Sequence, residues 1–152
     1  MAILEIGINF GLKSLVELKY YKDSDKVLDP KIRARFLSGV QSYISEVYDD
    51  KMNVISFSKF QFVCYYKLFH FADKKASGPQ QLIVFAIIEK GTDNYFVTQH
   101  LKEIISQFLK TYYLDEIMAQ DLDYFKPFEE KINNILGDLR FKMEDRFKRL
   151  FP

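Results

Sequence analysis

The chain has 152 residues, the usual length of one domain, and 48% of them are hydrophobic, which is enough to form a substantial core. Its 22 Lys and Arg side chains nearly balance its 21 Asp and Glu side chains, so the formal net charge is +1. This balance argues against nucleic-acid binding, which needs an excess of basic side chains to neutralise phosphates.

The sequence predicts a cytoplasmic protein. A single cysteine, Cys64, excludes an internal disulfide and favours a reducing compartment. Glu5 interrupts the apolar residues near the start, and no basic stretch precedes them, so no signal peptide is predicted. The longest apolar run, Leu82 to Ile88, has seven residues, against the roughly 20 that span a bilayer.

The first third of the chain predicts a β-hairpin followed by a helix. Ile3 to Phe10 alternates apolar and polar side chains with the two-residue period of a strand, and Val16 to Tyr20 alternates again after Gly11. A helix is predicted to begin at Asp29-Pro30, because Asp can accept hydrogen bonds from a first helical turn and Pro suits its first position. The apolar stripe of this helix is Ile32, Phe36, Leu37, Val40, Ile44 and Val47.

The middle of the chain predicts three strands. Asn53 to Phe71 is rich in Val, Ile, Phe and Tyr but is too long for one ordinary strand, so we expect it to divide near Ser58-Lys59. Ala72 to Gln80 contains Gly and Pro and predicts a loop. Leu82 to Ile88 is apolar throughout, which is typical of a strand covered on both faces, so helices are expected on both sides of the sheet.

Two helices are predicted to close the chain. The first follows a turn at Gly91 to Asn94, where Thr92 or Asp93 could cap it. Its apolar stripe is Val97, Leu101, Ile104, Ile105, Phe108, Leu109 and Tyr112. The second begins near Asp121 to Asp123, and its stripe is Phe125, Phe128, Ile132, Ile135, Leu136, Leu139 and Met143, with Phe147 and Leu150 as an extension.

These elements predict a single α/β domain of the α+β type over residues 1–152, in which residues 140–152 could form a helical tail. The predicted element order is β-β-α-β-β-β-α-α. One five-stranded, mainly antiparallel sheet satisfies this order, with one helix on one face and two on the other.

The sequence predicts no enzyme and no catalytic, cofactor-binding or metal site. His70 and His100 are far apart, and no pair of residues has the spacing of metal ligands. Cys64 alternates with Phe62 and Tyr66 in a predicted strand, where a small buried side chain is more common than a nucleophile. The six glycines are scattered singly and form no phosphate-binding loop.

Two charged segments allow more than one interpretation. Acidic side chains at Asp115-Glu116, Asp121, Asp123 and Glu129-Glu130 flank predicted helix starts, where negative charge is stabilising. An enzyme would need a cleft that joins carboxylates of displaced pKa from the last two helices. The tail from Asp138 to Pro152 carries five basic and three acidic side chains. It could pack on its own domain, contact a membrane peripherally or dock in a partner's groove. Its candidate contacts are Arg146, Phe147, Arg149 and Leu150.

The predicted element order and several segments resemble the longin domain and its roadblock-like relatives, of archaeal type. The resemblance rests on the segments ILEIGINFGLKSLVELKYY, DPKIRARFLSGVQSYISEV and NVISFSKFQFVCYYK. Within the second segment, the motif FLSGVQSYI at Phe36 to Ile44 is similar to archaeal longin-like proteins. The closing FEEKINNILGDL, at Phe128 to Leu139, fits the last helix of such domains.

The resemblance implies a non-catalytic platform for protein interaction in a trafficking or signalling complex. The implied partner is a small GTPase or another longin or roadblock domain, in a homodimer or heterodimer. An open sheet edge would support such pairing, because its unpaired amides and carbonyls can bond to a neighbour. The expected interface consists of Asn53, Ile55, Phe57 and Lys59 on an edge strand and Arg33, Gln41 and Tyr43 on the first helix.

A small-ligand sensor of the PAS or GAF type is the alternative, because such sensors also use one sheet flanked by helices. The 15 Phe and 10 Tyr side chains could line its pocket. A ligand-sized internal cavity would favour the sensor, whereas continuous packing across both faces of the sheet would reject it.

Overall fold

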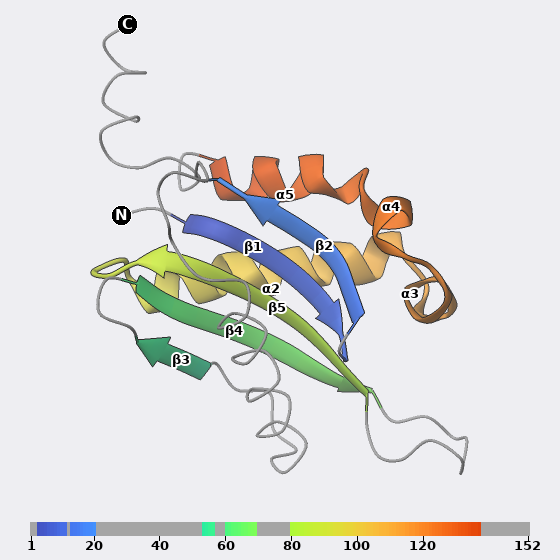
Figure 1. The fold of residues 1–152 in the computed structure, drawn as a ribbon, viewed down its shortest axis with the longest axis horizontal. Helices are drawn as coiled ribbons and strands as arrows, with labels where there is room; N and C mark the ends of the chain where they lie inside the picture. Colours follow the sequence, from blue (N-terminus) through green and yellow to red (C-terminus); the bar gives the residue numbers. More distant parts are fainter. Residues whose placement is uncertain (1–2, 12, 21–52, 57–59, 70–79, 138–152) are drawn as a thin grey trace, which may run out of the picture.

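A computed structural model describes residues 3–11, 13–20, 53–56, 60–69 and 80–137, which form one antiparallel sheet with helices packed against it (Figure 1). The strands are β1 (Ile3–Phe10), β2 (Lys13–Lys19), β3 (Asn53–Ser56), β4 (Phe60–Phe69) and β5 (Gln80–Glu89). The helices of these described residues are α2 (Asn94–Thr111), α3 (Leu114–Ala119), α4 (Leu122–Phe125) and α5 (Phe128–Leu136).

The strands lie in the order β2-β1-β5-β4-β3, and every neighbouring pair is antiparallel. Four strands are seven to ten residues long, and β3, at one edge of the sheet, has four residues. Phe85 at the centre of β5 lies opposite Gly7 on β1 and opposite Cys64 on β4. Because directly paired residues share a face, Gly7 and Cys64 flank the Phe85 ring.

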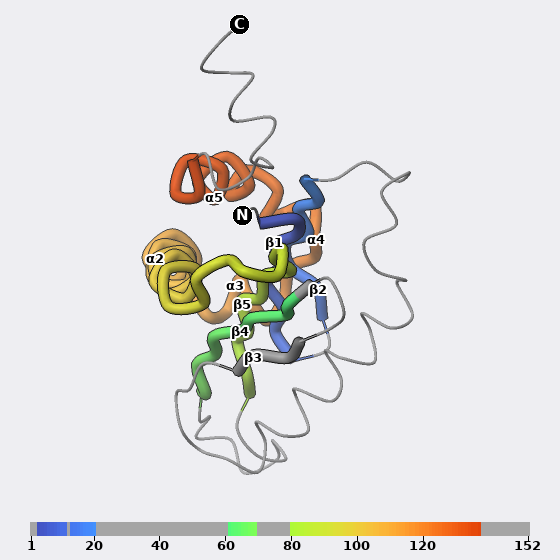
Figure 2. Tube along the Cα trace, turned by 90° about the vertical axis from the view of Figure 1, so that its left-hand side faces the viewer, coloured from blue at the N-terminus to red at the C-terminus, as the bar shows by residue number. Residues whose placement is uncertain are grey.

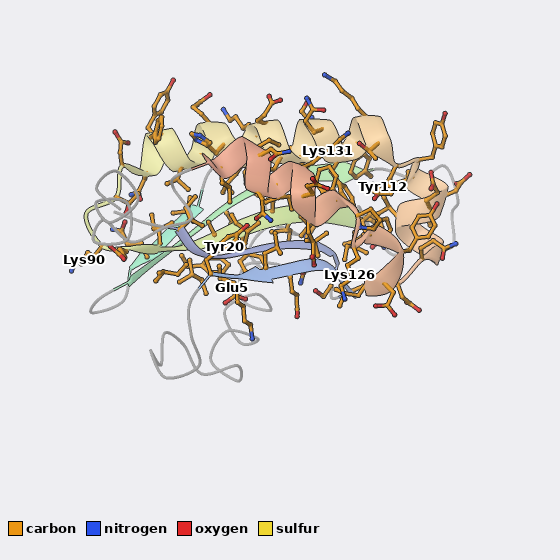
Figure 3. All side chains as sticks on the ribbon, turned by 90° about the horizontal axis from the view of Figure 1, so that it is seen from above. Glu5, Tyr20, Lys90, Tyr112, Lys126 and Lys131 are labelled. Atoms are coloured by element: carbon orange, nitrogen blue, oxygen red, sulfur yellow. The ribbon has the colours of Figure 1, made fainter. Side chains whose placement is uncertain are left out.

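Helices α2 and α5 lie on the same side of the sheet (Figures 2 and 3). The apolar side chains between them and the strands form the main core, which includes Ile6, Ile8, Val84, Ala86, Leu101, Ile104, Phe108, Phe128 and Ile132. The opposite face of the central strands is buried as well, since Phe62, Ile83 and Phe85 have no exposed surface. All residues from Leu82 to Ile88 are buried in β5, as their unbroken apolar sequence predicted.

Helix α2 begins where the predicted turn ends. The carboxylate of Asp93, which adopts an extended conformation, accepts hydrogen bonds from the backbone N–H groups of Tyr95 at 2.9 Å and Phe96 at 3.2 Å. These bonds satisfy two of the free N–H groups of the first helical turn. Of the two candidate caps, Asp93 therefore caps the helix.

The predicted fold is wrong in its element order and in its strand pairing. Four helices follow β5 where two were expected, so the order β-β-α-β-β-β-α-α does not hold. The sheet is antiparallel at every pairing instead of mainly so. The two long closing helices, α2 and α5, do cover one face, but the predicted first helix from Ile32 to Val47 lies outside the described residues.

The backbone explains why the last predicted helix is divided. Pro127 has no N–H group to bond to a carbonyl of the preceding turn, so α4 ends before it and α5 begins after it. Gly137 ends α5 with a φ of 54°, a left-handed conformation that glycine adopts readily. Of the predicted loop from Ala72 to Gln80, only Gln80 is described, and it already belongs to β5. The predicted tail, residues 140–152, lies outside the described residues.

Candidate protein-binding surfaces

The two edges of the sheet differ in their surroundings. At the β2 edge, the ammonium group of Lys13 donates hydrogen bonds to the carbonyl oxygens of Met118 at 2.8 Å and Gln120 at 3.0 Å. The Tyr20 hydroxyl, just after β2, donates to Asn133 Oδ1 on α5 at 2.6 Å. Strand β3 forms the other edge and, among the described residues, pairs only with β4.

The predicted interface is described only in part. Asn53 and Ile55 lie on β3, opposite Cys64 and Phe62 of β4, and therefore at the sheet edge. The other predicted interface and tail residues lie outside the described residues: Phe57, Lys59, Arg33, Gln41, Tyr43, Arg146, Phe147, Arg149 and Leu150. Binding at these positions stays a prediction.

A second exposed surface lies where α3 and α4 meet, and we name residues 113–125 the α3–α4 corner. Its exposed large apolar side chains are Tyr113 (81% exposed), Met118 (48%), Leu122 (42%) and Tyr124 (43%). In the sequence, this stretch stands out only for its carboxylates. The exposure of the four apolar residues could have been predicted, because they belong to neither of the two apolar stripes predicted for the closing helices.

The α3–α4 corner is held by an aromatic cluster of three buried phenylalanines and the half-buried Tyr112. The Tyr112 ring lies 4.9 Å from Phe125, 5.0 Å from Phe108 and 6.0 Å from Phe128, measured between ring centroids. Phe125 and Ile117 have no exposed surface. Figure 3 shows Tyr112 at the end of the molecule formed by α3 and α4. The corner is therefore packed against the core through these buried side chains, while its other apolar side chains face solvent.

A carboxylate joins the two short helices within the corner. Glu116 accepts hydrogen bonds from the backbone N–H of Tyr113 at 2.9 Å and from the Tyr124 hydroxyl. Because both bonds favour the charged carboxylate, the pKa of Glu116 is lowered. The same hydrogen bond raises the pKa of Tyr124, and burial, with the nearby Glu116 charge, raises the pKa of Tyr112. The contacts among Glu116, Tyr113 and Tyr124 are therefore strongest when the carboxyl is ionised.

Replacement of Lys13 by methionine should loosen the corner. The change removes two hydrogen bonds to carbonyl groups at the end of α3, and the site is exposed, so we expect a loss of about 1 kcal/mol in the free energy of unfolding. Hydrogen exchange should accelerate in α3 before it does in the strands. Lys90→Met is the matched control, because Lys90 lies exposed in the turn after β5. Equal protection of α3 in the two variants would contradict this role of Lys13.

A shallow groove of about 290 Å³ lies between α2 and α5, lined by Gln99, His100, Glu103 and Ile135. The His100 ring packs edge-on against Phe96, with the centroids 4.6 Å apart. The groove is open to solvent and lies outside the core between helix and sheet. The ligand-sensor alternative, which requires an internal cavity, stays a prediction.

The structure describes two of the three residues that the sequence offered for chemistry, Cys64 and His100. Cys64 has no exposed surface and lies in β4, as expected for a small core side chain. His70 lies outside the described residues. Within the described ranges, no three His, Cys, Asp or Glu side chains gather in a way that could hold a metal ion. None of the described helices combines the length and the apolar character needed to cross a membrane.

The sequence matches no protein-family model and no curated protein.

Proposed function

We propose that this chain is a non-catalytic protein-interaction module, longin-like in type, that binds a partner by extending its sheet at β3. The partner is a small GTPase or a second domain of the same kind. One observation carries the proposal: the sheet order places β3 at an edge, with β4 as its only strand neighbour among the described residues. Such a strand offers backbone N–H and C=O groups to an incoming strand.

The other surfaces of the sheet are less suited to a partner strand. At the β2 edge, Lys13 is already bonded to the end of α3, and Tyr20 is bonded to α5. Both faces of β1 and β5 are buried, so a partner on either face would have to displace core side chains. Strand addition at β3 would leave this core intact.

Two proline variants in β3 test the proposal. In an antiparallel ladder, consecutive residues direct their N–H and C=O groups to opposite sides. Of Val54 and Ile55, one therefore directs its backbone N–H and C=O groups toward β4, and the other directs them outward, away from the sheet. Proline at the inward position removes a ladder bond and should lower the unfolding temperature. Proline at the outward position is compatible with an edge strand and should leave that temperature nearly unchanged. It should nevertheless weaken partner binding at least about tenfold, roughly 1.4 kcal/mol.

The binding measurement uses the full chain, immobilised and titrated with a panel of small GTPases loaded with GDP or GTP. Sedimentation equilibrium of the same chain measures pairing with a second copy. Tyr95→Ala is the control, because Tyr95 is 72% exposed and lies on α2, outside the sheet. A stable outward-facing proline variant that binds GTPases and self-associates like the wild type would refute strand addition. So would a wild-type chain that stays monomeric and binds no GTPase.

A further inference from the structure

We propose that the α3–α4 corner is a docking surface for a basic segment of a partner protein, in which Arg or Lys side chains alternate with apolar ones. Six large hydrophobic side chains are exposed in the part of the chain that the structure describes, and four of them lie in this corner. The other two, Tyr95 and Phe96, lie at the start of α2. Concentration of exposed apolar side chains in one place is typical of an interaction site.

The charge of the corner determines which partner fits it. Asp115, Asp121 and Asp123 are exposed among the apolar side chains. Against them stand two basic side chains, Lys126 and the Lys13 ammonium group that is bonded to the end of α3. An acidic surface repels nucleic-acid phosphates and anionic lipid headgroups, and it attracts basic side chains. Exposed tyrosine rings add to this preference, because Arg and Lys bind favourably over an aromatic face.

The corner is also rigid enough to bind without a large loss of entropy. Lys13 holds the end of α3 by two hydrogen bonds, and Glu116 links the start of α3 to Tyr124 on α4. Underneath, Phe125 packs against Phe108 and Tyr112. A surface whose backbone is fixed before binding loses little conformational freedom on association, so more of the contact energy appears as affinity.

This surface is separate from the one proposed for sheet extension. The corner contacts β2 through Lys13, whereas β3 lies at the opposite edge of the sheet. Figure 1 shows the two at different ends of the molecule. Both surfaces could therefore bind a partner at the same time, and each can be inactivated by mutation without affecting the other.

The test uses the full chain and two synthetic peptides. One peptide alternates arginine with leucine, and the matched peptide replaces each arginine with glutamate. Titration calorimetry should show binding of the arginine peptide only, and that binding should weaken as salt is added, because ionic strength screens exposed charges. In the full chain, amide NMR shifts should change in residues 113–125 and not in β3.

Variants of the corner should then lose affinity without losing the fold. Tyr113→Ala and Leu122→Ala should each weaken binding up to about tenfold, as expected when a central apolar contact is truncated. The double change of Asp121 and Asp123 to asparagine should weaken it by a similar factor and reduce its salt dependence. Because these side chains are exposed, unfolding temperatures should stay near the wild-type value. Tyr95→Ala is the matched control and should bind like the wild type.

Three results would overturn the proposal: equal binding of both peptides, wild-type affinity in all corner variants, or shifts confined to other parts of the chain. Binding to neutral phosphatidylcholine vesicles that is lost in Tyr113→Ala, with no peptide binding, would identify a lipid surface instead and would also overturn it. The outward-facing proline variant of β3 should bind the arginine peptide normally. Failure of sheet extension and failure of this docking surface are therefore distinguishable.

Discussion

Replacement of Phe108 by alanine is expected to lower the free energy of unfolding by about 3–5 kcal/mol, a large part of the stability of a domain this size. Phe108 has no exposed surface. Its ring centroid lies 5.0 Å from Tyr112, 5.1 Å from Phe128 and 5.5 Å from Phe125. Truncation would leave a cavity where α2, α4 and α5 meet, and rings packed at these distances cannot close it by small shifts.

Denaturant unfolding of the purified chain measures this effect. Phe108→Leu is the milder variant and should cost only about 1–1.5 kcal/mol, so the position can be tested even if the alanine variant does not fold. Phe96→Ala is the control on the same helix, because Phe96 is 50% exposed and should contribute much less. Equal losses for Phe108→Ala and Phe96→Ala would show that the ring cluster does not hold the closing helices to the sheet.

The elements predicted correctly are those in which neighbouring residues form one unbroken pattern of apolar side chains. Ile3 to Phe10 alternates, and Leu82 to Ile88 is unbroken apolar sequence; both are strands. The apolar spacing from Val97 and the cap at Asp93 identified α2. In each case one short-range feature decides the backbone conformation, because burial of a regular stripe or row outweighs other preferences.

The closing helices were mispredicted because apolar spacing does not report backbone breaks. Phe125, Phe128 and Ile132 follow one another at helical intervals, and all three are buried. They are buried, however, from two helices that Pro127 separates. The spacing is satisfied on both sides of the break, so the missing N–H of Pro127 was the only local sign of it.

The candidate surfaces depend on tertiary structure in a way that no local pattern contains. Nothing in the composition of Asn53 to Ser56 distinguishes an edge strand from an interior one, and the expected edge came from a family resemblance. Tyr113 and Leu122 are residue types found most often in cores. Tyr113 and Leu122 are exposed because Ile117 and Phe125 take the buried positions of the same two short helices. The chemistry of the corner was visible in the sequence as acidic residues, but its apolar exposure was not predicted.

Gly7 shows the same dependence on pairing, and its replacement by alanine is the second large effect that we expect. A Cβ atom at Gly7 would overlap the ring of Phe85, which lies opposite it across the β1–β5 ladder. That ring cannot move aside easily, because it has no exposed surface and stacks on Phe62 with the centroids 5.3 Å apart. Overpacking of this kind should lower the free energy of unfolding by about 1–3 kcal/mol.

A double-mutant cycle with Phe85→Leu separates this overlap from a general effect on the strand. Leucine keeps an apolar side chain in β5 but removes the ring that covers Gly7. In that background Gly7→Ala should cost little or even stabilise, because glycine within a strand is unfavourable by about 0.5–1 kcal/mol relative to alanine. The expected coupling is therefore about 1–3 kcal/mol, measured by denaturant unfolding of the four proteins. Additive losses would mean that Gly7 is needed for some reason other than space for the Phe85 ring.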